Sequence, residues 1–254
     1  MKIAELKFKI LYKAYKEDIR IKRLLGQMRK VIEEYDMVQS GDRIAVGVSG
    51  GKDSLTMLIG LAKLRDFYPK RFEIEAITLT LGIGEFDTSP IKKLCEELKV
   101  NYTVEETNIG KIIFEERKEK NPCSLCANMR RGALHNTAKK LKCNKVALGH
   151  NKDDLIETFM LSLFYEGRIH VFSPVTYLER KELYLIRPLI YVEESEVKSF
   201  IRQNDISIVK NPCVANGNTK RQEIKEEIIS WQKEKKDIKS NLFGAIKRSH
   251  LSGW

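Results

Sequence analysis

The sequence predicts an α/β protein in which a twisted parallel β-sheet carries helices on its faces, with further helical segments at both ends. Between residues 41 and 190, apolar strand-like runs alternate with segments of helical periodicity, a pattern typical of βαβ units. A glycine pair stands between the first such strand and the first such helix. We therefore expect a basic N-terminal helical segment at 1–40, an α/β core at 41–190 and a helical C-terminal extension at 191–254.

The first 30 residues are strongly basic. They hold ten Lys or Arg residues against three acidic ones, and so carry most of the net charge of +11. Apolar residues are interleaved with these charges at Leu6, Ile10, Tyr15, Leu24, Leu25 and Met28. The pattern predicts one or two amphipathic helices with basic faces, for which nucleic acid is the favoured partner. A solvated helix face is the alternative, and an anionic membrane surface is disfavoured because tryptophan is absent there.

The elements of the core follow in order along the chain. Apolar, β-branched runs predict strands at Arg43–Val48, Phe72–Thr80, Asn101–Glu105 and Lys145–Leu148. Helical periodicity predicts helices at Leu55–Phe67, Ile91–Lys99, Ala127–Leu141 and Leu155–Phe164, and later at Glu193–Gln203 and Thr219–Lys236. Ligands of parallel sheets bind beyond the carboxyl ends of the strands, so the residues that follow the strands are the candidate site.

The segment Ser49–Ser54 follows the first strand and has the composition of a phosphate-binding loop. Gly50 and Gly51 permit positive φ and place no Cβ in the way of a ligand. The helix that follows offers unpaired N–H groups to an anion, and Ser49, Lys52 and Ser54 add hydroxyl and ammonium donors.

The amino-acid sequence of this loop distinguishes between two classes of nucleotide-binding enzyme. Val46 and Asp53 occupy the positions where a Walker loop needs glycine and a hydroxyl residue. The segment instead resembles the S-G-G-x-D-S pyrophosphate-binding loop of the ATP pyrophosphatases, which cleave ATP between its α and β phosphates. The alternative is an ordinary surface turn.

A second polar segment, Gly149–Asp154, follows the fourth predicted strand and opens a helix. Its adjacent carboxylates, Asp153 and Asp154, are oxygen ligands of the kind that Mg²⁺ prefers beside nucleotide phosphates. The alternative is a pair of N-capping aspartates that support the helix dipole. Because the same chain also carries the Ser49–Ser54 loop, the Mg²⁺-binding interpretation is favoured over helix capping.

Three of the five cysteines need a chemical explanation. Cys123 and Cys126 form a C-x-x-C pair on a predicted loop, and Cys213 repeats the Asn-Pro-Cys context of Cys123. Such a set can bind a metal or an iron–sulfur cluster, and three thiolates suit a cubane cluster with one open iron. A redox dithiol plus a buried cysteine is the alternative. Cys95 and Cys143 are expected to be buried.

Taken together, these motifs resemble the tRNA 2-thiocytidine synthetases of the PP-loop ATP pyrophosphatase superfamily. The resemblance runs from about residue 32 to 251, and Leu81–Phe86 and Asn216 depart from the family pattern. The matching segments are Ser49–Ser54, Cys123–Cys126 with Arg130–Gly132, Gly149–Asp154, Phe164–Gly167, Ile186–Leu189, Pro212–Cys213, Arg221–Lys225 and Ser249–Leu251. It implies an adenine nucleotide alpha hydrolase-like fold and an ATP-dependent sulfurtransferase that replaces the 2-oxo group of a tRNA cytidine with sulfur.

The resemblance also implies roles for individual residues. Catalytic roles are expected for Lys52, Asp53, Arg130 and Asp154, with Arg131 as an alternative to Arg130. ATP is expected at Ser49, Gly50, Gly51, Lys52, Asp53, Ser54, Gly149, His150 and Asp153, with Mg²⁺ near Asp53, Asp153 or Asp154. A 4Fe–4S cluster is expected on Cys123, Cys126 and Cys213.

The expected partners are tRNA and a sulfur donor, either a cysteine desulfurase or free sulfide, and we expect a homodimer. Apolar runs such as Ile44–Val48 are too short to span a bilayer, and charges interrupt the first residues, so the predicted location is the cytoplasm without membrane attachment.

Several rival functions share some of these features. A tRNA uridine 2-thiolase would share the loop and the three cysteines, but is expected to carry additional zinc-binding cysteine pairs. A tRNA lysidine synthetase would not need the cysteines, and a small-molecule ATP pyrophosphatase would leave the basic segment unexplained. An RNA-binding protein with a vestigial loop is disfavoured because Lys52, Asp53, Asp153 and Asp154 are intact.

Overall fold

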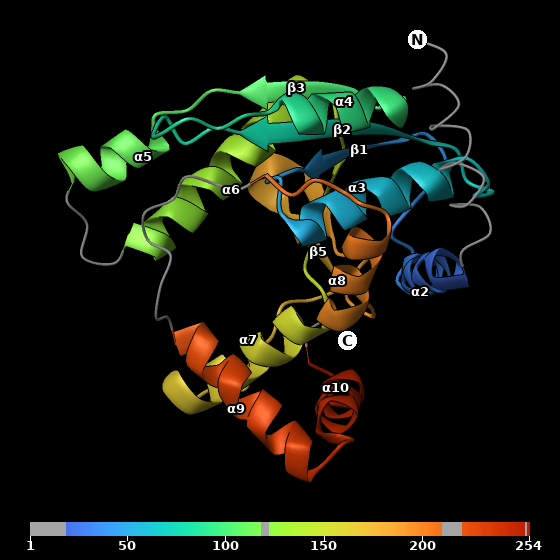
Figure 1. Cartoon of the computed structure of the whole chain (residues 1–254), viewed down its shortest axis with the longest axis vertical. Coiled ribbons are helices and arrows are strands. Elements are labelled where there is room, and N and C mark those ends of the chain that lie inside the picture. The colour runs from blue at the N-terminus through green and yellow to red at the C-terminus, as the bar shows by residue number, and fades with distance from the viewer. Residues whose placement is uncertain (1–18, 118–121, 210–219, 252) are drawn as a thin grey trace.

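A computed structural model describes residues 19–117, 122–209, 220–251 and 253–254 of the protein. These residues contain one six-stranded sheet (Figure 1). The strand order is β3-β2-β1-β4-β6-β5, and all neighbours are parallel except β5 and β6. The strands are β1 (Asp42–Gly47), β2 (Phe72–Leu79), β3 (Asn101–Glu105), β4 (Lys145–Ala147), β5 (Val175–Leu178) and β6 (Leu183–Ile186). The predicted parallel α/β sheet is therefore confirmed.

The helices lie between and after the strands. They are α2 (Ile19–Glu34), α3 (Lys52–Arg65), α4 (Ser89–Glu97), α5 (Ile109–Lys111), α6 (Pro122–Lys140), α7 (Lys152–Tyr165), α8 (Glu194–Gln203), α9 (Lys220–Glu234) and α10 (Ile238–Arg248). Two short segments complete the series, a π-helix at Ile112–Glu116 and a 3₁₀ helix at Glu179–Lys181. None of the described helices is long and apolar enough to cross a membrane.

The core is divided by the sheet into two layers, as the alternation of strand residues requires. Ile44 and Val46 of β1 face the layer formed by α2, α3, α4 and α8, whereas Ala45 faces α6. Helix α3 is buried on nearly every side because it lies between the sheet and its neighbours α2 and α8. The carboxyl end of β1 and the start of α3 are thereby fixed on both faces.

The described part of the basic segment is a structural helix. Helix α2 buries Leu24, Met28, Val31 and Ile32 against the core and leaves its charged residues exposed. A Cβ on Gly60 of α3 would lie 2.4 Å from the Met28 Sδ, so the two helices touch at this glycine. The predicted amphipathic helix is confirmed for this part of the segment, and residues 1–18 lie outside the described residues.

The last two helices, α9 and α10, pack with α7 into a separate apolar cluster at the lower end of the molecule in Figure 1. The sequence analysis expected α9 but not α10, β5 or β6. Each of these strands is four residues long, and they pair as a hairpin whose outer strand β5 is only partly buried. A short edge strand of this kind carries too few alternating residues to be recognised from pattern alone.

Candidate active site

The Ser49–Ser54 loop leaves β1 and enters α3 in a fixed conformation. The Ser54 Oγ accepts a hydrogen bond from the Ser49 N–H at 3.1 Å and donates one to the Gly51 carbonyl oxygen at 2.9 Å. Gly50 adopts a φ of +79°, which favours glycine, and Gly51 occupies the N-cap of α3 without a side-chain cap. The first N–H groups of α3 are thus available to an anion.

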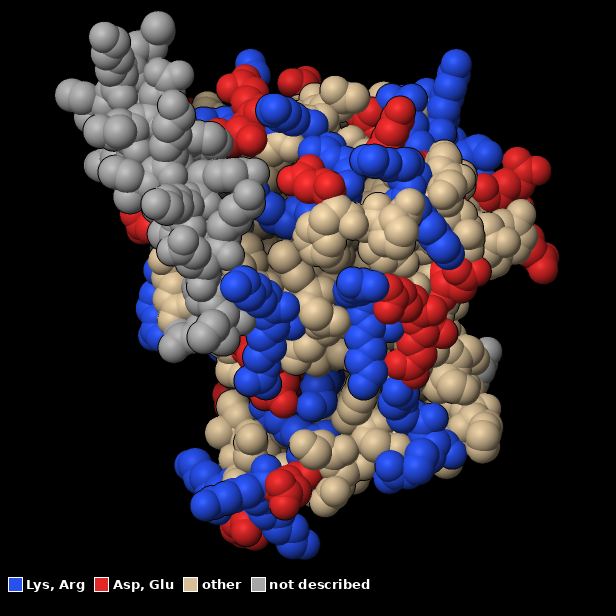
Figure 2. All heavy atoms as spheres, turned by 90° about the vertical axis from the view of Figure 1, so that its right-hand side faces the viewer, with Lys and Arg blue, Asp and Glu red and all other residues tan. Residues whose placement is uncertain are grey.

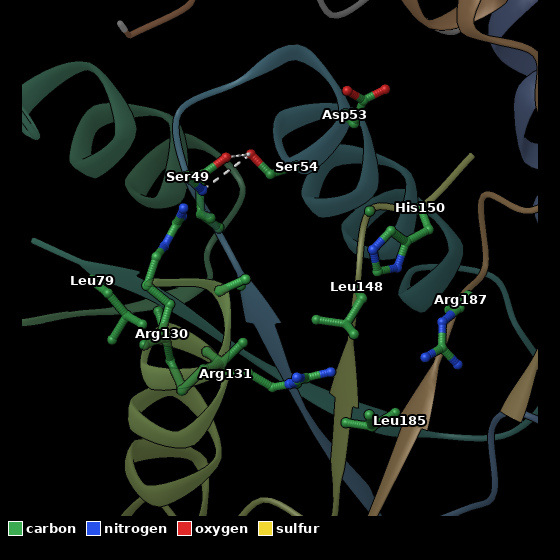
Figure 3. Close-up of a pocket in the computed structure, with 16 residues that line it drawn as sticks. Ser49, Asp53, Ser54, Leu79, Arg130, Arg131, Leu148, His150, Leu185 and Arg187 are labelled. Atoms are coloured by element: carbon green, nitrogen blue, oxygen red, sulfur yellow. Dashed lines mark hydrogen bonds between the residues drawn. The ribbon is translucent and has the colours of Figure 1, made fainter. Parts of the chain in front are cut away.

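A cavity of about 440 Å³ opens beside this loop, over the carboxyl ends of β1, β4 and β6 (Figure 3). Helix α6 forms its opposite wall. The lining residues are Gly47, Val48, Ser49, Asp53, Ser54, Ile77, Leu79, Ala127, Arg130, Arg131, Leu134, Leu148, Gly149, His150, Leu185 and Arg187. The structure therefore brings the two predicted polar segments and the α6 arginines to one cavity.

Three arginines give the cavity an excess of positive charge. Arg130 and Arg131 project from α6 and Arg187 follows β6, while Asp53 is the one acidic residue in the lining. Within the described ranges, none of the three arginines forms an ion pair. Arg131 instead donates to the Asn128 side chain. The cavity is suited to a ligand that carries several negative charges.

Lys52, the loop ammonium, lies in a small cluster of charges. Its Nζ is 2.6 Å from the Asp53 carboxylate and 3.1 Å from the Glu194 carboxylate of α8. Burial works in the opposite direction, but the hydrogen bonds and charges of these two carboxylates together raise the pKa of Lys52. Lys52 is therefore a stable cation, held at the first turn of α3.

The second polar segment packs directly on the loop. The Asn151 amide Nδ2 donates to the Asp53 carboxylate at 2.9 Å. A Cβ on Gly149 would lie 3.1 to 3.2 Å from the backbone of Asp53 and Ser54, so a side chain at this position would press on the loop. Because Gly149, just after β4, has no side chain, the Gly149–Asp154 segment can pack against the Ser49–Ser54 loop.

The two predicted carboxylates of this segment face other groups. Asp154 accepts from the Asn151 N–H at 2.9 Å in a capping box at the start of α7, and burial raises its pKa. Asp153 accepts from the Lys239 Nζ at 2.6 Å and from the Glu194 N–H at 2.7 Å. Neither residue lines the cavity. Asn151 is thus the N-cap of α7, and Asp154 completes its capping box, a role close to the capping that the sequence left open as an alternative.

His150 lines the cavity as a neutral side chain. Its ring lies 4.9 Å from the Phe172 ring, and its Nδ1 is buried and has no hydrogen-bond partner among the described residues. Burial, followed by the nearby positive charge of Arg187, lowers the pKa of His150 to about 4. At neutral pH the imidazole therefore carries no charge.

Cys123 and Cys126 lie in the first turn of α6, which begins at Pro122, and not on a loop as predicted. The helix starts early because proline is favoured at the first helical position. Residues at i and i+3 share a helix face, so the two thiols are neighbours. Cys123 is exposed, and Cys126 packs half-buried against the cluster of Leu81, Ile109 and Ile113.

The remaining cysteines divide into two groups. Cys213 lies outside the described residues, and no set of three metal-ligating side chains occurs in the part of the chain that is described. Cys95 and Cys143 are buried as expected, and burial raises their pKa values to about 12 and about 11 respectively. These two thiols are therefore unreactive at neutral pH.

Sequence reasoning assigned no role to two residues at this site, Arg187 and Glu194. Arg187 stood in a quoted motif, but nothing in its neighbours indicated that it would be buried in the cavity wall. Glu194 begins a helix in an ordinary acidic first turn, and its pairing with Lys52 joins residues more than 140 positions apart. Only the fold reveals either contact.

Comparison with known proteins places this chain among its relatives. A family model for the PP-loop domain matches residues 19–231. The tRNA-cytidine(32) 2-sulfurtransferase of Geobacter sulfurreducens is 36% identical over 91% of this chain and 91% of its own length. That of Geotalea daltonii is 38% identical over 91% of this chain and 92% of its own length.

A solved structure agrees with these relatives. The U34-tRNA thiolase NcsA from Methanococcus maripaludis, described with its 4Fe–4S cluster, superposes with a TM-score of 0.74. It is 27% identical and covers 92% of this chain and 80% of its own. The chain therefore belongs to the PP-loop family and, within it, to the tRNA-cytidine(32) 2-sulfurtransferases.

Proposed function

We propose that this protein uses ATP to replace the 2-oxo group of a tRNA cytidine with sulfur, at position 32 as in its named relatives. One observation carries the proposal. Helix α6 bears the cysteine pair in its first turn and both cavity arginines in the turns that follow, opposite the phosphate loop. A single helix thus joins the candidate sulfur-handling residues to the candidate ATP site.

The chemistry has two steps. The base oxygen attacks the α-phosphate of ATP, a P–O bond to pyrophosphate breaks, and an adenylated base forms. Sulfide then adds at the activated carbon and AMP departs with the oxygen. Lys52, the N–H groups of the loop and Arg130 would offset the negative charge on the departing pyrophosphate.

Mg²⁺ fits this site through Asp53. Asp53 is the acidic side chain of the cavity lining, and Lys52 and Asn151 already orient its carboxylate. Asp153 and Asp154 would act indirectly, since both are occupied in holding α7, α8 and α10 in place.

The cysteines suit the 4Fe–4S cluster that is present in the related U34 thiolase. Cys123 and Cys126 share one helix face, and Cys213 would complete a set of three thiolates. A cluster held by three thiolates leaves one iron open, which supplies a binding position for the sulfur to be transferred. A cysteine desulfurase or free sulfide would provide that sulfur, in the cytoplasm, to a homodimer.

The decisive experiment is mass spectrometry of nucleosides from tRNA that has been incubated with the anaerobically purified protein, ATP, Mg²⁺ and sulfide. We expect 2-thiocytidine, with release of AMP and pyrophosphate. Lys52→Ala should abolish the product and leave the iron content unchanged, while Lys92→Ala on the exposed face of α4 serves as the matched control.

Three outcomes would contradict the proposal. A 2-thiouridine product would assign the uridine chemistry of the structural relative. Lysidine would remove sulfur from the reaction. Release of ADP and phosphate would show that the loop does not act as a pyrophosphatase.

A further inference from the structure

The end of the cavity farthest from the phosphate loop contains a buried guanidinium with unused donors. The Arg187 side chain is only 7% exposed. Its Nη1 donates to the Ser173 carbonyl oxygen at 2.5 Å and to the Thr176 Oγ1 at 3.2 Å. Its Nε is buried and has no hydrogen-bond partner, and Nη2 has none among the described residues. Two of the three nitrogens therefore have donors to spare.

The charge of Arg187 is also uncompensated. In the described part of the chain no carboxylate pairs with it, and its neighbours in the cavity wall are the neutral His150 and the cation Arg131. Burial, and then the charge of Arg131, lowers the pKa of Arg187 to about 10, so it still carries its proton at neutral pH. A buried charge without a partner is costly unless a ligand of opposite charge completes it.

The surroundings hold this guanidinium in one place. It lies over the Phe172 ring at 5.0 Å, and the His150 ring lies 4.9 Å from the same Phe172 ring. The stack His150–Phe172–Arg187 leaves the guanidinium few alternative positions. In Figure 3 the Arg187 and Arg131 side chains extend toward the same part of the cavity from its two walls. The two cations are near enough for the charge of Arg131 to lower the pKa of Arg187, and an anion between them would be stabilised by both.

This place is separate from the phosphate loop. The loop follows β1 and Arg187 follows β6, and β4 lies between these two strands in the sheet. Two strand spacings correspond to about 10 Å. Arg187 therefore approaches the cavity from a different strand than the phosphate loop, which leaves its guanidinium available to a second anion.

We propose that Arg187, with Arg131, forms a second anion site in the cavity that holds a backbone phosphodiester of the RNA nucleotide to be modified. The inference rests on the proposed function. In phosphoryl transfer the attacking and leaving oxygens lie roughly in line. With pyrophosphate on the loop after β1, the attacking nucleotide would approach from the side away from the loop, and the part of the cavity over β4 and β6, where Arg187 lies, has room on that side.

The first test measures the affinity of the Arg187→Gln variant for full-length tRNA and, separately, for ATP by equilibrium titration. Both affinities are compared with those of the native protein. We expect tRNA affinity to fall about ten- to hundredfold, as for loss of a charged hydrogen bond, and ATP affinity to stay within about twofold. Arg187→Lys, which keeps the charge but not the planar fork, should recover part of the loss. The control is Arg71→Gln, an exposed arginine directly before β2 and therefore at the amino ends of the strands, away from the cavity.

A second test takes its main result from the native protein, so that result does not depend on whether the variant folds. Anticodon stem–loop RNAs are made with one uncharged methylphosphonate linkage at each position around the target cytidine. One linkage beside that cytidine should weaken binding to the native protein about tenfold or more, and the same linkage should have little further effect on Arg187→Gln.

Other results would overturn the inference. If Arg187→Gln weakened ATP or pyrophosphate binding and left tRNA binding intact, the anion would belong to the nucleotide instead. Equal binding of all methylphosphonate RNAs would remove the phosphodiester site. Formation of 2-thiocytidine by the native protein is scored independently, so either result would contradict this site without contradicting the proposed function.

Discussion

Gly50 adopts a φ of +79°, and a Cβ there would lie 2.9 Å from the Val209 Cβ. The Val209 N–H donates to the Gly50 carbonyl oxygen at 3.0 Å, so the phosphate loop is hydrogen-bonded to the chain a few residues before Cys213. The glycine thus serves two purposes, a backbone conformation and a close contact. A side chain at this position would disturb both the positive-φ conformation and the contact with Val209.

We predict that Gly50→Ala lowers the stability by about 1–3 kcal/mol, because a residue with a side chain is strained at this φ, and that it also lowers the rate of ATP cleavage. Gly26→Ala is the matched control, since nothing lies within 4 Å of its added Cβ in the exposed part of α2. Thermal unfolding and pyrophosphate release measure the two effects. Equal stability of both variants would show that the loop is free to adopt another conformation.

At the scale of single residues, local chemistry decides what sequence can predict. The loop glycines were predictable because positive φ and anion binding are properties of the segment itself. The orientation of Asp153 was not, because capping a helix and binding a metal need the same local sequence. Its partner Lys239 lies 86 residues away. Arg187 was hidden for the same reason, since its burial depends on Phe172 and Thr176 in a hairpin that pattern alone did not reveal.

Between elements, Glu194 is the main electrostatic connection. Its carboxylate pairs with Lys52 of α3, Lys198 of α8 and Lys225 of α9 at 2.8 to 3.1 Å. Burial alone would raise the pKa of Glu194, but the hydrogen bonds from Lys225, Lys198 and Lys52 lower it to about 2.

This pKa predicts a pH-dependent contribution of Glu194 to stability. The folded pKa lies below the ordinary 4.5, so the ionised carboxylate stabilises the fold fully above about pH 4.5 and loses that effect as the pH falls toward 2. Glu194→Gln should therefore be less stable than the native protein at pH 7, with the difference shrinking between pH 4.5 and 2. Thermal midpoints across this range measure it, with the exposed Glu97→Gln as control. A difference that does not change with pH would contradict the network.

Helix α6 gives a second prediction at this scale. Cys123→Ser, Cys126→Ser and Cys213→Ser should each remove the iron from the anaerobically purified protein, because three thiolates are needed to hold the cluster. Cys143→Ala removes a buried thiol elsewhere and should keep the iron. Iron and sulfide analysis with absorbance spectroscopy gives the result. Retention of the cluster in Cys213→Ser would mean that a different group completes the set.

The elements that sequence analysis predicted were the long ones with clear periodicity. All four predicted strands and the predicted helices of the core appear within a few residues of their expected bounds. Helix α6 started five residues earlier than expected because Cys123–Cys126 was interpreted as a ligand-bearing loop, although proline at the first position permits a helix. The four-residue strands β5 and β6 pair with each other, and β6 also pairs with β4. No local sequence pattern predicts this pairing.

At the scale of the molecule, the positive charge of the described residues is distributed rather than concentrated on the face that Figure 2 shows. Figure 2, which views the molecule from the right-hand side of Figure 1, shows Lys and Arg side chains interspersed with Asp and Glu. On α2, Arg23 pairs with Glu196 and Arg29 with Glu33, while Lys22 and Lys30 form no ion pair within the described residues. Among the α2 side chains that the structure describes, these two lysines are available to RNA phosphates.

We predict that replacing both Lys22 and Lys30 by Gln weakens tRNA binding uniformly across sequences and lowers the slope of log affinity against log salt by about 1–2, because fewer counterions are released. ATP binding should not change. Lys92 and Lys93 on the exposed face of α4 provide the charge-matched control. An unchanged slope in the α2 variant would assign its lysines to a solvated face. Deleting α2 is not an equivalent test, because Met28 and Val31 belong to the core.

The C-terminal helices have a consequence for how this chain could recombine with its relatives during evolution. Asp153 and Glu157 of α7 are nearly buried, and their ion-pair partners are Lys239 of α10 and Arg221 of α9 respectively. A crossover between α8 and α9 that imported helices without these cations would leave the two buried carboxylates of α7 without their ion-pair partners, which would destabilise the fold. Gene exchange at that boundary is therefore restricted to donors that carry matching cations. The ion pairs of α7 thus couple the C-terminal helices to the α/β core when sequences are exchanged.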